Sequence, residues 1–430
     1  MKRIFCMIAM LVLLASSLHA QDISGDWQGR LGSGKGSLRL IVHIDKADDG
    51  GWKALLYSID QTAEGVPLTS ITQQSSSIAF SITELKVTYK GTIGSDGSSI
   101  VGSYTQGGTV PLTLVRPTKE TAWPRDIHCA CVASFVPVAP GVNLEVLDWG
   151  GTGRPLLLLA GLGYDAHDFD AFAAKLIGKY HVYGISRRGF GESSSPPPTV
   201  ANYNADRLGD DVLAVIDALH LKQRPVLVGH SIAGEELSSI GSRYPDKVAG
   251  LVYLDASYSY AFYDRAHGDY ELDAVEAIKD LQNLVTEDSE EKKPLEEVLA
   301  KLPELEKVLR EEQEAIAGFP PDDPSETASE FGPGEAIELG EQKYTEIKVP
   351  ILAIFAVPHK FDPTPEYSAA GRAAIAKYDV ETTTAQANAF EAGVPSAHVV
   401  RIPNADHFVY KSNEADVLRE INAFLDKLPN

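Results

Sequence analysis

The spacing of apolar residues changes near residue 117 and divides the chain into two regions. In residues 21–117, short runs of alternating apolar and polar residues are separated by clusters of Gly, Asp and Ser. Alternation with a period of two is typical of strands with one buried face, so this region is predicted to be an all-β, barrel-like domain. The runs with this pattern are 37–44, 77–82 and 86–89.

Residues 118–126 contain Trp123-Pro124 and are predicted to link the first region to a second one, 127–430. In the second region, continuous apolar runs alternate with stretches of helical spacing. Continuous apolar strands are buried on both faces, as in a mostly parallel sheet covered by helices, so an α/β fold is predicted. The predicted strands are 132–138, 143–148, 156–159, 181–185, 226–228, 251–254, 351–355 and 399–402, and clear helices are 206–219 and 414–428.

This alternation stops between about 258 and 345. Apolar residues there fall at helical spacing, and the opposite faces are rich in Asp and Glu, which predicts amphipathic helices. Because these helices are inserted between two strands of the sheet, we expect them to form a cap above the carboxyl ends of the strands. Their acidity is interpreted first as a face in contact with solvent.

The most informative motif is a serine on a Gly-rich turn. Residues 229–234 read Gly-His-Ser-Ile-Ala-Gly, follow the apolar run 225–228 and lead into a predicted helix. A sharp turn between a strand and a helix exposes a serine hydroxyl, which predicts that Ser231 is a nucleophile. His230 is interpreted as structural support for the turn.

A serine hydroxyl needs a base to take its proton during attack, and that base needs a carboxylate to orient it. His407 follows the last predicted strand and is the expected base. Asp362 follows the strand 351–355 and is the expected acid. Asp255, at the end of the preceding strand, is the alternative acid.

The second region resembles the serine hydrolases of the α/β-hydrolase superfamily, of a carboxylesterase-like kind. Beyond the serine turn, residues 159–163 resemble the loop after the third strand of that family, and 186–194 resemble its Arg-Gly-x-Gly-x-Ser loop. The resemblance implies that the backbone N–H groups of Ile232 and Leu162 form an oxyanion hole. Ala233 replaces the second glycine of the usual Gly-x-Ser-x-Gly motif.

A shorter motif, Gly25-Asp26-Trp27, resembles the opening of lipocalin-like barrels. Such a barrel holds an apolar ligand in some proteins and is a packed stabilising module in others. The packed module is the favoured interpretation here.

The predicted function is hydrolysis of a carboxylic ester, or a related acyl bond of a small-molecule substrate, through an acyl-enzyme. The resemblance implies no metal and no organic cofactor. A nucleophilic serine disfavours the superfamily members that attack through aspartate, such as epoxide hydrolases and haloalkane dehalogenases. Two alternatives stay open: an aminopeptidase or amidase on the same fold, and a catalytically silent ligand-binding protein.

The formal net charge is -22, from 38 basic and 60 acidic residues. This balance disfavours nucleic acids and anionic membranes as partners, because both attract clustered Lys and Arg. Charge and pattern indicate no particular oligomeric state.

Residues 1–20 have the features of a secretory signal peptide: a basic start at Lys2 and Arg3, an apolar run, and small residues before Ala20. The run is shorter than the roughly 20 apolar residues of a membrane-spanning helix. The protein is therefore expected to be exported, periplasmic or secreted, with no integral membrane segment after cleavage. Cys129 and Cys131 are expected to be free buried thiols, because a bridge between them would close a strained ring.

Overall fold

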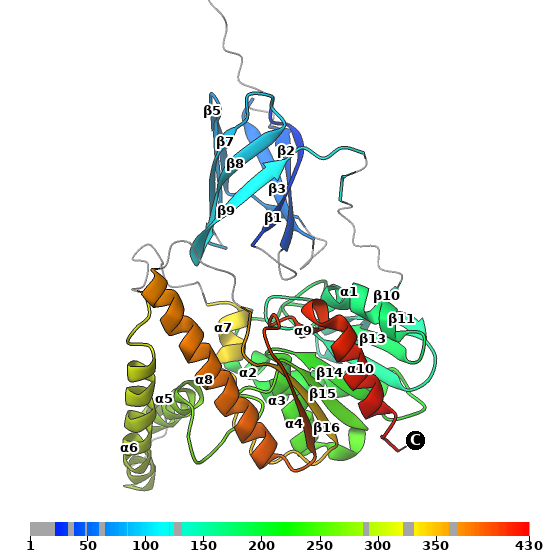
Figure 1. Ribbon diagram of the computed structural model, residues 1–430, viewed down its shortest axis with the longest axis vertical. Helices are drawn as coiled ribbons and strands as arrows, with labels where there is room; N and C mark the ends of the chain where they lie inside the picture. The colour runs from blue at the N-terminus through cyan, green and yellow to red at the C-terminus, as the bar shows by residue number, and fades with distance from the viewer. Residues whose placement is uncertain are drawn as a thin grey trace, which may run out of the picture.

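The computed structural model describes residues 22–32, 38–47, 50–59, 65–83, 85–119, 121–123, 131–286, 292–320, 331–360 and 368–429. The predicted signal peptide and Cys129 lie outside these residues. Figure 1 shows a β domain at one end of the long axis and an α/β domain at the other.

Within the described residues, the first domain is a single antiparallel sheet with the strand order β4-β3-β2-β1-β9-β8-β7-β6-β5. The chain between β4 and β5 bridges the two edges of the sheet: Leu68 N–H donates to the carbonyl of Ala54 at 2.9 Å, and Thr69 N–H donates to that of Ser81 at 2.8 Å. The prediction of a barrel-like all-β domain is confirmed. The strands are β1 (Gly25–Leu31), β2 (Leu38–Lys46), β3 (Trp52–Ser58), β4 (Val66–Pro67), β5 (Ser70–Gln74), β6 (Ser77–Ile82), β7 (Val87–Ile93), β8 (Ser99–Gln106) and β9 (Gly108–Val115).

Large aromatic side chains fill part of the interior of this domain. Trp27 and Tyr89 are both fully buried. Phe80 stacks on Tyr89 with 4.8 Å between the ring centroids. The Tyr89 hydroxyl is within 3.2 Å of the carbonyl of Ile100 and 3.1 Å of that of Leu112, so its polar atom is satisfied inside the core. This part of the interior is a packed core.

The second domain is built on a sheet with the strand order β10-β11-β13-β12-β14-β15-β16-β17. β10 and β11 pair antiparallel, whereas the pairs from β13 to β17 are parallel. The predicted α/β fold is confirmed. The strands are β10 (Val132–Ala139), β11 (Val142–Gly151), β12 (Pro155–Leu159), β13 (His181–Ile185), β14 (Val226–His230), β15 (Gly250–Leu254), β16 (Ile351–Ala356) and β17 (Ala397–Ile402).

Helices cover both faces of this sheet and bury its apolar side chains in two layers. α3, α4 and α8 contribute to one layer, as Val212, Leu237 and Phe390 show. α1 and α10 contribute to the other, through Phe172 and Val417. The helices are α1 (Asp170–Leu176), α2 (Val200–Tyr203), α3 (Ala205–Ala218), α4 (Ala233–Arg243), α5 (Tyr270–Thr286), α6 (Lys292–Ala315), α7 (Pro333–Glu338), α8 (Ala369–Gly393), α9 (Val409–Ser412) and α10 (Glu414–Leu425).

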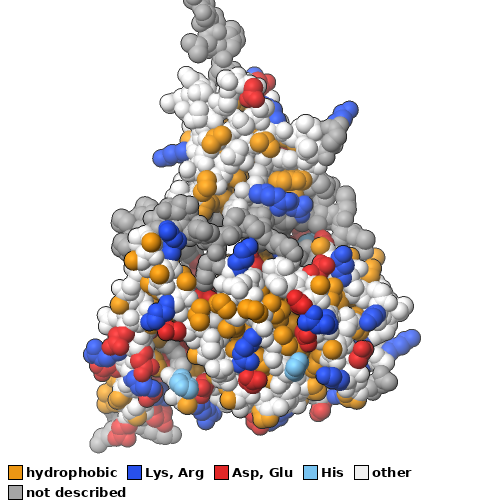
Figure 2. All heavy atoms as spheres, in the orientation of Figure 1, with side chains coloured by type: hydrophobic (Ala, Val, Ile, Leu, Met, Phe, Trp, Pro, Cys, Tyr) orange, Lys and Arg blue, Asp and Glu red, His pale blue; other side chains and the backbone are white. Residues whose placement is uncertain are grey.

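The insertion between β15 and β16 contains α5, α6 and α7. In Figure 1, α5 and α6 lie beside α8, and the Tyr378 hydroxyl of α8 donates to Glu312 of α6 at 2.9 Å. α7 instead lies near the serine turn, because a Cβ on Gly334 would meet the side chain of Leu162 at 4.0 Å. On the face shown in Figure 2, acidic and basic side chains are interspersed over this region.

Two further features complete the fold. Cys131 is disulfide-bonded, which contradicts the expectation of a free thiol at this position. The oxidising conditions expected of an exported protein are those in which disulfides persist. Among the described helices, none has both the length and the apolar character needed to cross a membrane.

Candidate active site

Ser231 lies on a tight turn between β14 and α4 and has a φ of 53°. This left-handed conformation is unfavourable for residues other than glycine and is typical of functional turns. The N–H of Ser231 donates to the carbonyl of Leu254 at 3.3 Å, and its own carbonyl accepts the N–H of Gly234 at 2.9 Å. The turn is therefore held from both sides while it carries the serine at the carboxyl end of β14.

Close packing around this turn requires small residues. A Cβ on Gly234 would lie only 1.9 Å from the carbonyl oxygen of Ala256, so α4 approaches the neighbouring backbone at this residue. Ala233, one residue earlier, is fully buried and fits with its methyl group. The glycine that this approach requires is thus one position later than in the usual motif.

The loop after β12 lies against the serine turn. A Cβ on Gly161 would be 2.9 Å from Nδ1 of His230 and 3.3 Å from Cβ of Ser231. The preceding carbonyl, of Ala160, accepts a hydrogen bond from Arg187 at 2.9 Å. The structure thus brings the loop that carries Leu162 next to the turn of Ser231, as the predicted oxyanion hole requires.

Arg187 braces this loop from a buried position. Its guanidinium contacts both carboxylate oxygens of Glu236 on α4, at 2.7 and 2.8 Å. Side-chain exposures are 5% for Arg187 and 3% for Glu236, so the pair is removed from solvent. A bidentate contact of this kind fixes geometry, and here it ties the oxyanion loop to the helix that follows the serine.

His407 contacts a carboxylate, and that carboxylate is the alternative acid of the sequence analysis. Its Nδ1 lies 2.6 Å from Oδ2 of Asp255. Oδ1 of Asp255 accepts the backbone N–H of Ala356 at 2.9 Å, and Asp255 itself is 1% exposed. Asp362, the acid favoured from sequence, lies outside the described residues. The structure therefore favours Asp255 as the partner of His407.

Hydrogen bonds keep Asp255 ionised. Burial alone would raise the pKa of this carboxyl group, but hydrogen bonds from His359 and His407 outweigh burial and hold the pKa below its usual range. The hydroxyl of Tyr258 is a further donor, 3.3 Å from Oδ2.

His230 supports the turn rather than taking part in the chemistry. Its Nε2 donates to the backbone carbonyl of His407 at 3.1 Å, and the two rings are 4.6 Å apart. Burial, followed by the charge of His407, holds the pKa of His230 well below its usual value, so the ring is neutral. His230 thereby joins the loop after β17 to the residue next to Ser231.

His359 was not anticipated from sequence. It follows β16, and its Nε2 lies 2.7 Å from Oδ2 of Asp255, the same oxygen that His407 contacts. Its Nδ1 lies 2.6 Å from Oδ1 of Asp379 on α8. The available signal was its position after a parallel strand next to β15, since such loops gather at the carboxyl edge of the sheet.

Donor atoms of Asp255, His359 and His407 lie within 4.8 Å of one another, a spacing that one metal ion could bridge. Catalytic zinc sites use three protein ligands and an open position. Here, however, both imidazoles direct a nitrogen at a single carboxylate oxygen, at 2.6 and 2.7 Å. These are hydrogen bonds of ordinary length, and we assign no metal ligands to this cluster.

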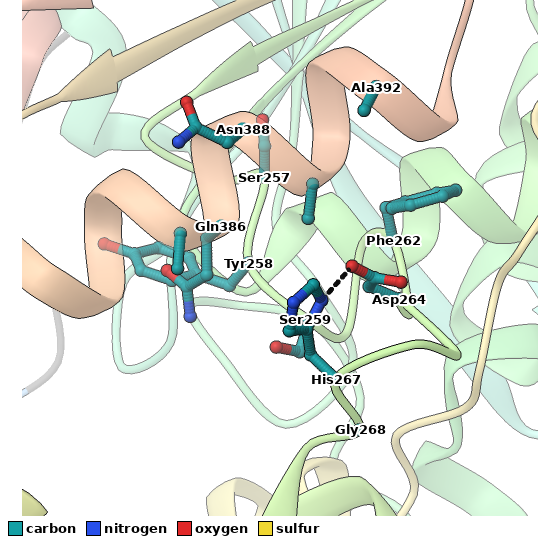
Figure 3. A pocket seen from close by; sticks show the side chains of 12 residues that line it. Ser257, Tyr258, Ser259, Phe262, Asp264, His267, Gly268, Gln386, Asn388 and Ala392 are labelled. Atoms are coloured by element: carbon teal, nitrogen blue, oxygen red, sulfur yellow. Dashed lines mark hydrogen bonds and ion pairs between the residues drawn. The ribbon is translucent and has the colours of Figure 1, made fainter.

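A cavity of about 440 Å³ borders the acid side of the site, between α8 and the loop after β15 (Figure 3). Tyr258, the residue that contacts Asp255, forms part of its wall, together with Phe262. Ser257 and Gln386 also line it. A molecule bound here would therefore meet both apolar and polar side chains.

Comparison with known proteins identifies the fold. A family model described as the alpha/beta hydrolase family matches residues 156–420, more than half of the chain. The chain belongs to this family. Family membership supports hydrolysis as the reaction class.

Individual relatives of this hydrolase are distant. A putative non-heme haloperoxidase of Mycobacterium phage D29 is 30% identical over 139 residues, which are 32% of this chain and 49% of the relative. This chain thus spans about half of that relative's length. The 2-(acetamidomethylene)succinate hydrolase of Mesorhizobium japonicum is 24% identical over 283 residues, 64% of this chain and 89% of the relative. A crystal structure of E-2-(acetamidomethylene)succinate hydrolase aligns with a TM-score of 0.42 and 22% identity, over 69% of this chain and 99% of that one.

Proposed function

We propose that this hydrolase is an exported serine enzyme that cleaves a carboxylic ester, or a related acyl bond, through Ser231, His407 and Asp255. The observation that carries the proposal is the 2.6 Å contact between Asp255 and His407, whose backbone carbonyl accepts a hydrogen bond from His230 in the strained turn that carries Ser231. Fold and family support hydrolysis as the reaction class, and the three side chains supply its chemistry.

In the proposed reaction, Oγ of Ser231 attacks the carbonyl carbon of the substrate and its proton passes to His407. Nδ1 of His407 is engaged by Asp255, so Nε2 is the atom that receives this proton. Backbone N–H groups of Ile232 and Leu162 would stabilise the negative charge on the carbonyl oxygen. The leaving alcohol takes the proton from His407, and water then cleaves the acyl-enzyme by the same steps, releasing the acid and restoring Ser231.

Tyr260 lies next to Ser231, and burial raises the pKa of its hydroxyl well above the usual value, so this neighbour of Ser231 is neutral.

The test is hydrolysis of short-chain nitrophenyl esters by the chain without residues 1–20, compared with its Ser231→Ala variant. The proposal expects ester turnover that the substitution lowers at least about 1000-fold, as removal of a nucleophile does in related triads. Equal turnover by the two proteins would exclude the mechanism.

An amidase is the second candidate, because the relative aligned over 89% of its length is named for a substrate with an acetamido group, which contains an amide bond. Parallel assays with acyl nitroanilides separate the two candidates. A higher kcat/KM for the anilides than for the matched esters would replace the esterase by the amidase.

Export is proposed from the signal-like residues 1–20. Expression of the full chain in a bacterial host, followed by mass analysis of the protein from the periplasm and medium, tests it. We expect a chain that begins near residue 21. A full-length protein confined to the cytoplasm would contradict export.

A further inference from the structure

The loop after β16 delivers a second imidazole to the acid of the site, and that imidazole has a carboxylate of its own. Nε2 of His359 contacts Asp255 at 2.7 Å, while Nδ1 contacts Asp379 at 2.6 Å. Asp379 also accepts the backbone N–H of His359 at 3.0 Å, so it holds both the ring and the chain. Side-chain exposures of 12% for His359 and 10% for Asp379 show that the pair lies largely inside the protein.

The loops that carry the two imidazoles are joined to each other. The N–H of Lys360 donates to the carbonyl of Ala405 at 2.7 Å, and the N–H of Asn404 donates to that of Pro358 at 2.9 Å. These backbone contacts fix the segment with His359 beside the segment with His407. The shared contact with Asp255 is therefore built into the carboxyl edge of β16 and β17.

The contacts of His359 define its charge. A neutral imidazole has one donor nitrogen and one acceptor nitrogen, whereas the imidazolium donates from both. Both nitrogens of His359 face carboxylate oxygens, which only accept, so only the protonated ring satisfies both contacts. Burial opposes this charge, but hydrogen bonds and charge interactions with Asp255 and Asp379 overcome it and raise the pKa of His359 to about 9.

We propose that His359 is a positioning residue that Asp379 holds as a cation, and that its charge and hydrogen bond fix Asp255 in its contact with His407. The role of His407 as a base rests on the proposed function; the charge of His359 does not. Four groups around His359 bear on this charge: Asp255 after β15, Asp379 on α8, His407 with its ring 5.9 Å away, and Tyr258 through Asp255.

The charge of His359 can be removed while its hydrogen bond is kept. In His359→Gln, the amide N–H of glutamine can still donate to Asp255, whereas the positive charge whose ring lies 5.9 Å from that of His407 is lost. By Coulomb's law, the carboxylate of Asp255 should then attract the N–H of His407 more strongly.

The test is an NMR titration of the mature full chain labelled with ¹⁵N-histidine, which requires no turnover. In the unsubstituted protein, His359 should show two N–H signals up to about pH 8, as expected for a ring held protonated. In Asp379→Asn, the second N–H signal of His359 should disappear at a lower pH than in the unsubstituted protein. In His359→Gln, the Nδ1–H signal of His407 should move downfield, as expected for a stronger hydrogen bond to Asp255.

His181→Gln is the matched control, because Nε2 of His181 also contacts a carboxylate, that of Asp148 at 2.8 Å. His181 begins β13, at the end of the strand away from the carboxyl edge that carries the site. The substitution should leave the signals of His359 and His407 unchanged. A single N–H signal for His359 at pH 7 would overturn the proposal, as would an Nδ1–H signal of His407 that moves no more in His359→Gln than in His181→Gln. If His359→Gln does not fold, the His359 signals of the unsubstituted protein and of Asp379→Asn test the charge of His359.

Activity gives a separate measurement. His359→Gln should change kcat for ester hydrolysis and leave KM nearly unchanged, because it alters the contact between Asp255 and His407 and not the binding of substrate. Absence of turnover in the unsubstituted protein would contradict the proposed function and leave the NMR outcome for His359 intact, so the two failures are distinguishable.

Discussion

Nδ1 of His407 lies 2.6 Å from Oδ2 of Asp255, although 152 positions separate the two residues in the sequence. Parallel strands explain the contact. Asp255 directly follows β15, and His407 follows β17 in the same run of parallel strands, so both lie at the same carboxyl edge of the sheet as Ser231, which directly follows β14. Asp255 and Ser231 also have positive φ, 48° and 53°, which turns the chain sharply after each strand.

This contact predicts which carboxylate the reaction uses. Asp255→Asn should lower kcat for ester hydrolysis by up to about 10⁴-fold, because an amide in place of the carboxylate favours the wrong tautomer of the histidine. Asp362→Asn, in the segment where the sequence favours the acid, should lower it by less than a few-fold. Steady-state kinetics on both variants provides the measurement, and a larger loss in Asp362→Asn would return the role to that residue.

The pKa of His359 predicts how stability depends on pH. This pKa is raised from 6.5 to about 9 in the folded protein, so its contribution to stability is fully present below pH 6.5 and is lost as pH rises through about 9. The contribution is on the order of 1 to 3 kcal/mol, allowing for partial exposure.

Urea unfolding of the unsubstituted protein and of His359→Gln between pH 6 and pH 10 measures the contribution of the His359 charge to stability. The difference between their unfolding free energies should shrink above about pH 9, where His359 is neutral in both the folded and the unfolded chain. A constant difference across this range would contradict the assignment of the charge.

The ion pair between Arg187 and Glu236 predicts a large loss of stability when it is broken. Glu236→Gln leaves a buried guanidinium without its counter-charge and should lower the free energy of unfolding by about 3 to 5 kcal/mol. The exposed pair of Arg310 and Glu306, 2.6 Å apart at its shortest against 2.7 Å for the buried pair, is the control. Glu306→Gln should change the free energy by less than about 0.5 kcal/mol. Comparable losses in urea unfolding would show that burial of the first pair has no energetic consequence.

Gly234 predicts a steric effect at the start of α4. A Cβ there would lie 1.9 Å from the carbonyl oxygen of Ala256, and no rotamer change relieves a clash with backbone. Gly234→Ala should therefore displace the turn that carries Ser231 and lower both the melting temperature and ester turnover. Gly178→Ala is the control, since a Cβ at Gly178 meets nothing within 4 Å. An unchanged crystal structure and activity in Gly234→Ala would contradict this packing.

Local pattern was enough to predict most of the fold. The run 181–185 is β13 to the residue, and 226–228 lies inside β14 (Val226–His230), because strands buried on both faces are continuous in apolar residues. α8 was missed, since its 25 residues are rich in Ala and Thr and carry only a few scattered buried positions, without a clear apolar stripe.

The residues of the candidate site were harder to predict from the sequence than the fold. Ser231 sits in a local strand–turn–helix motif, and the motif alone indicates its exposed position. Asp255, His359 and Asp379 meet only after three separate strands and helices have packed, so no local spacing relates them. Family pattern favoured the loop after β16 for the acid, whereas at residue 359 that loop supplies a histidine.

The central claim is that Ser231 is an activated nucleophile. Treatment of the mature protein with a fluorophosphonate probe, followed by peptide mass spectrometry, tests it most directly because the probe reacts only with an activated serine. We expect one adduct, on the peptide that contains Ser231, and its disappearance in Ser231→Ala and near-complete loss in Asp255→Asn. A folded protein that carries no adduct at Ser231, or carries it equally after Asp255→Asn, would contradict the account.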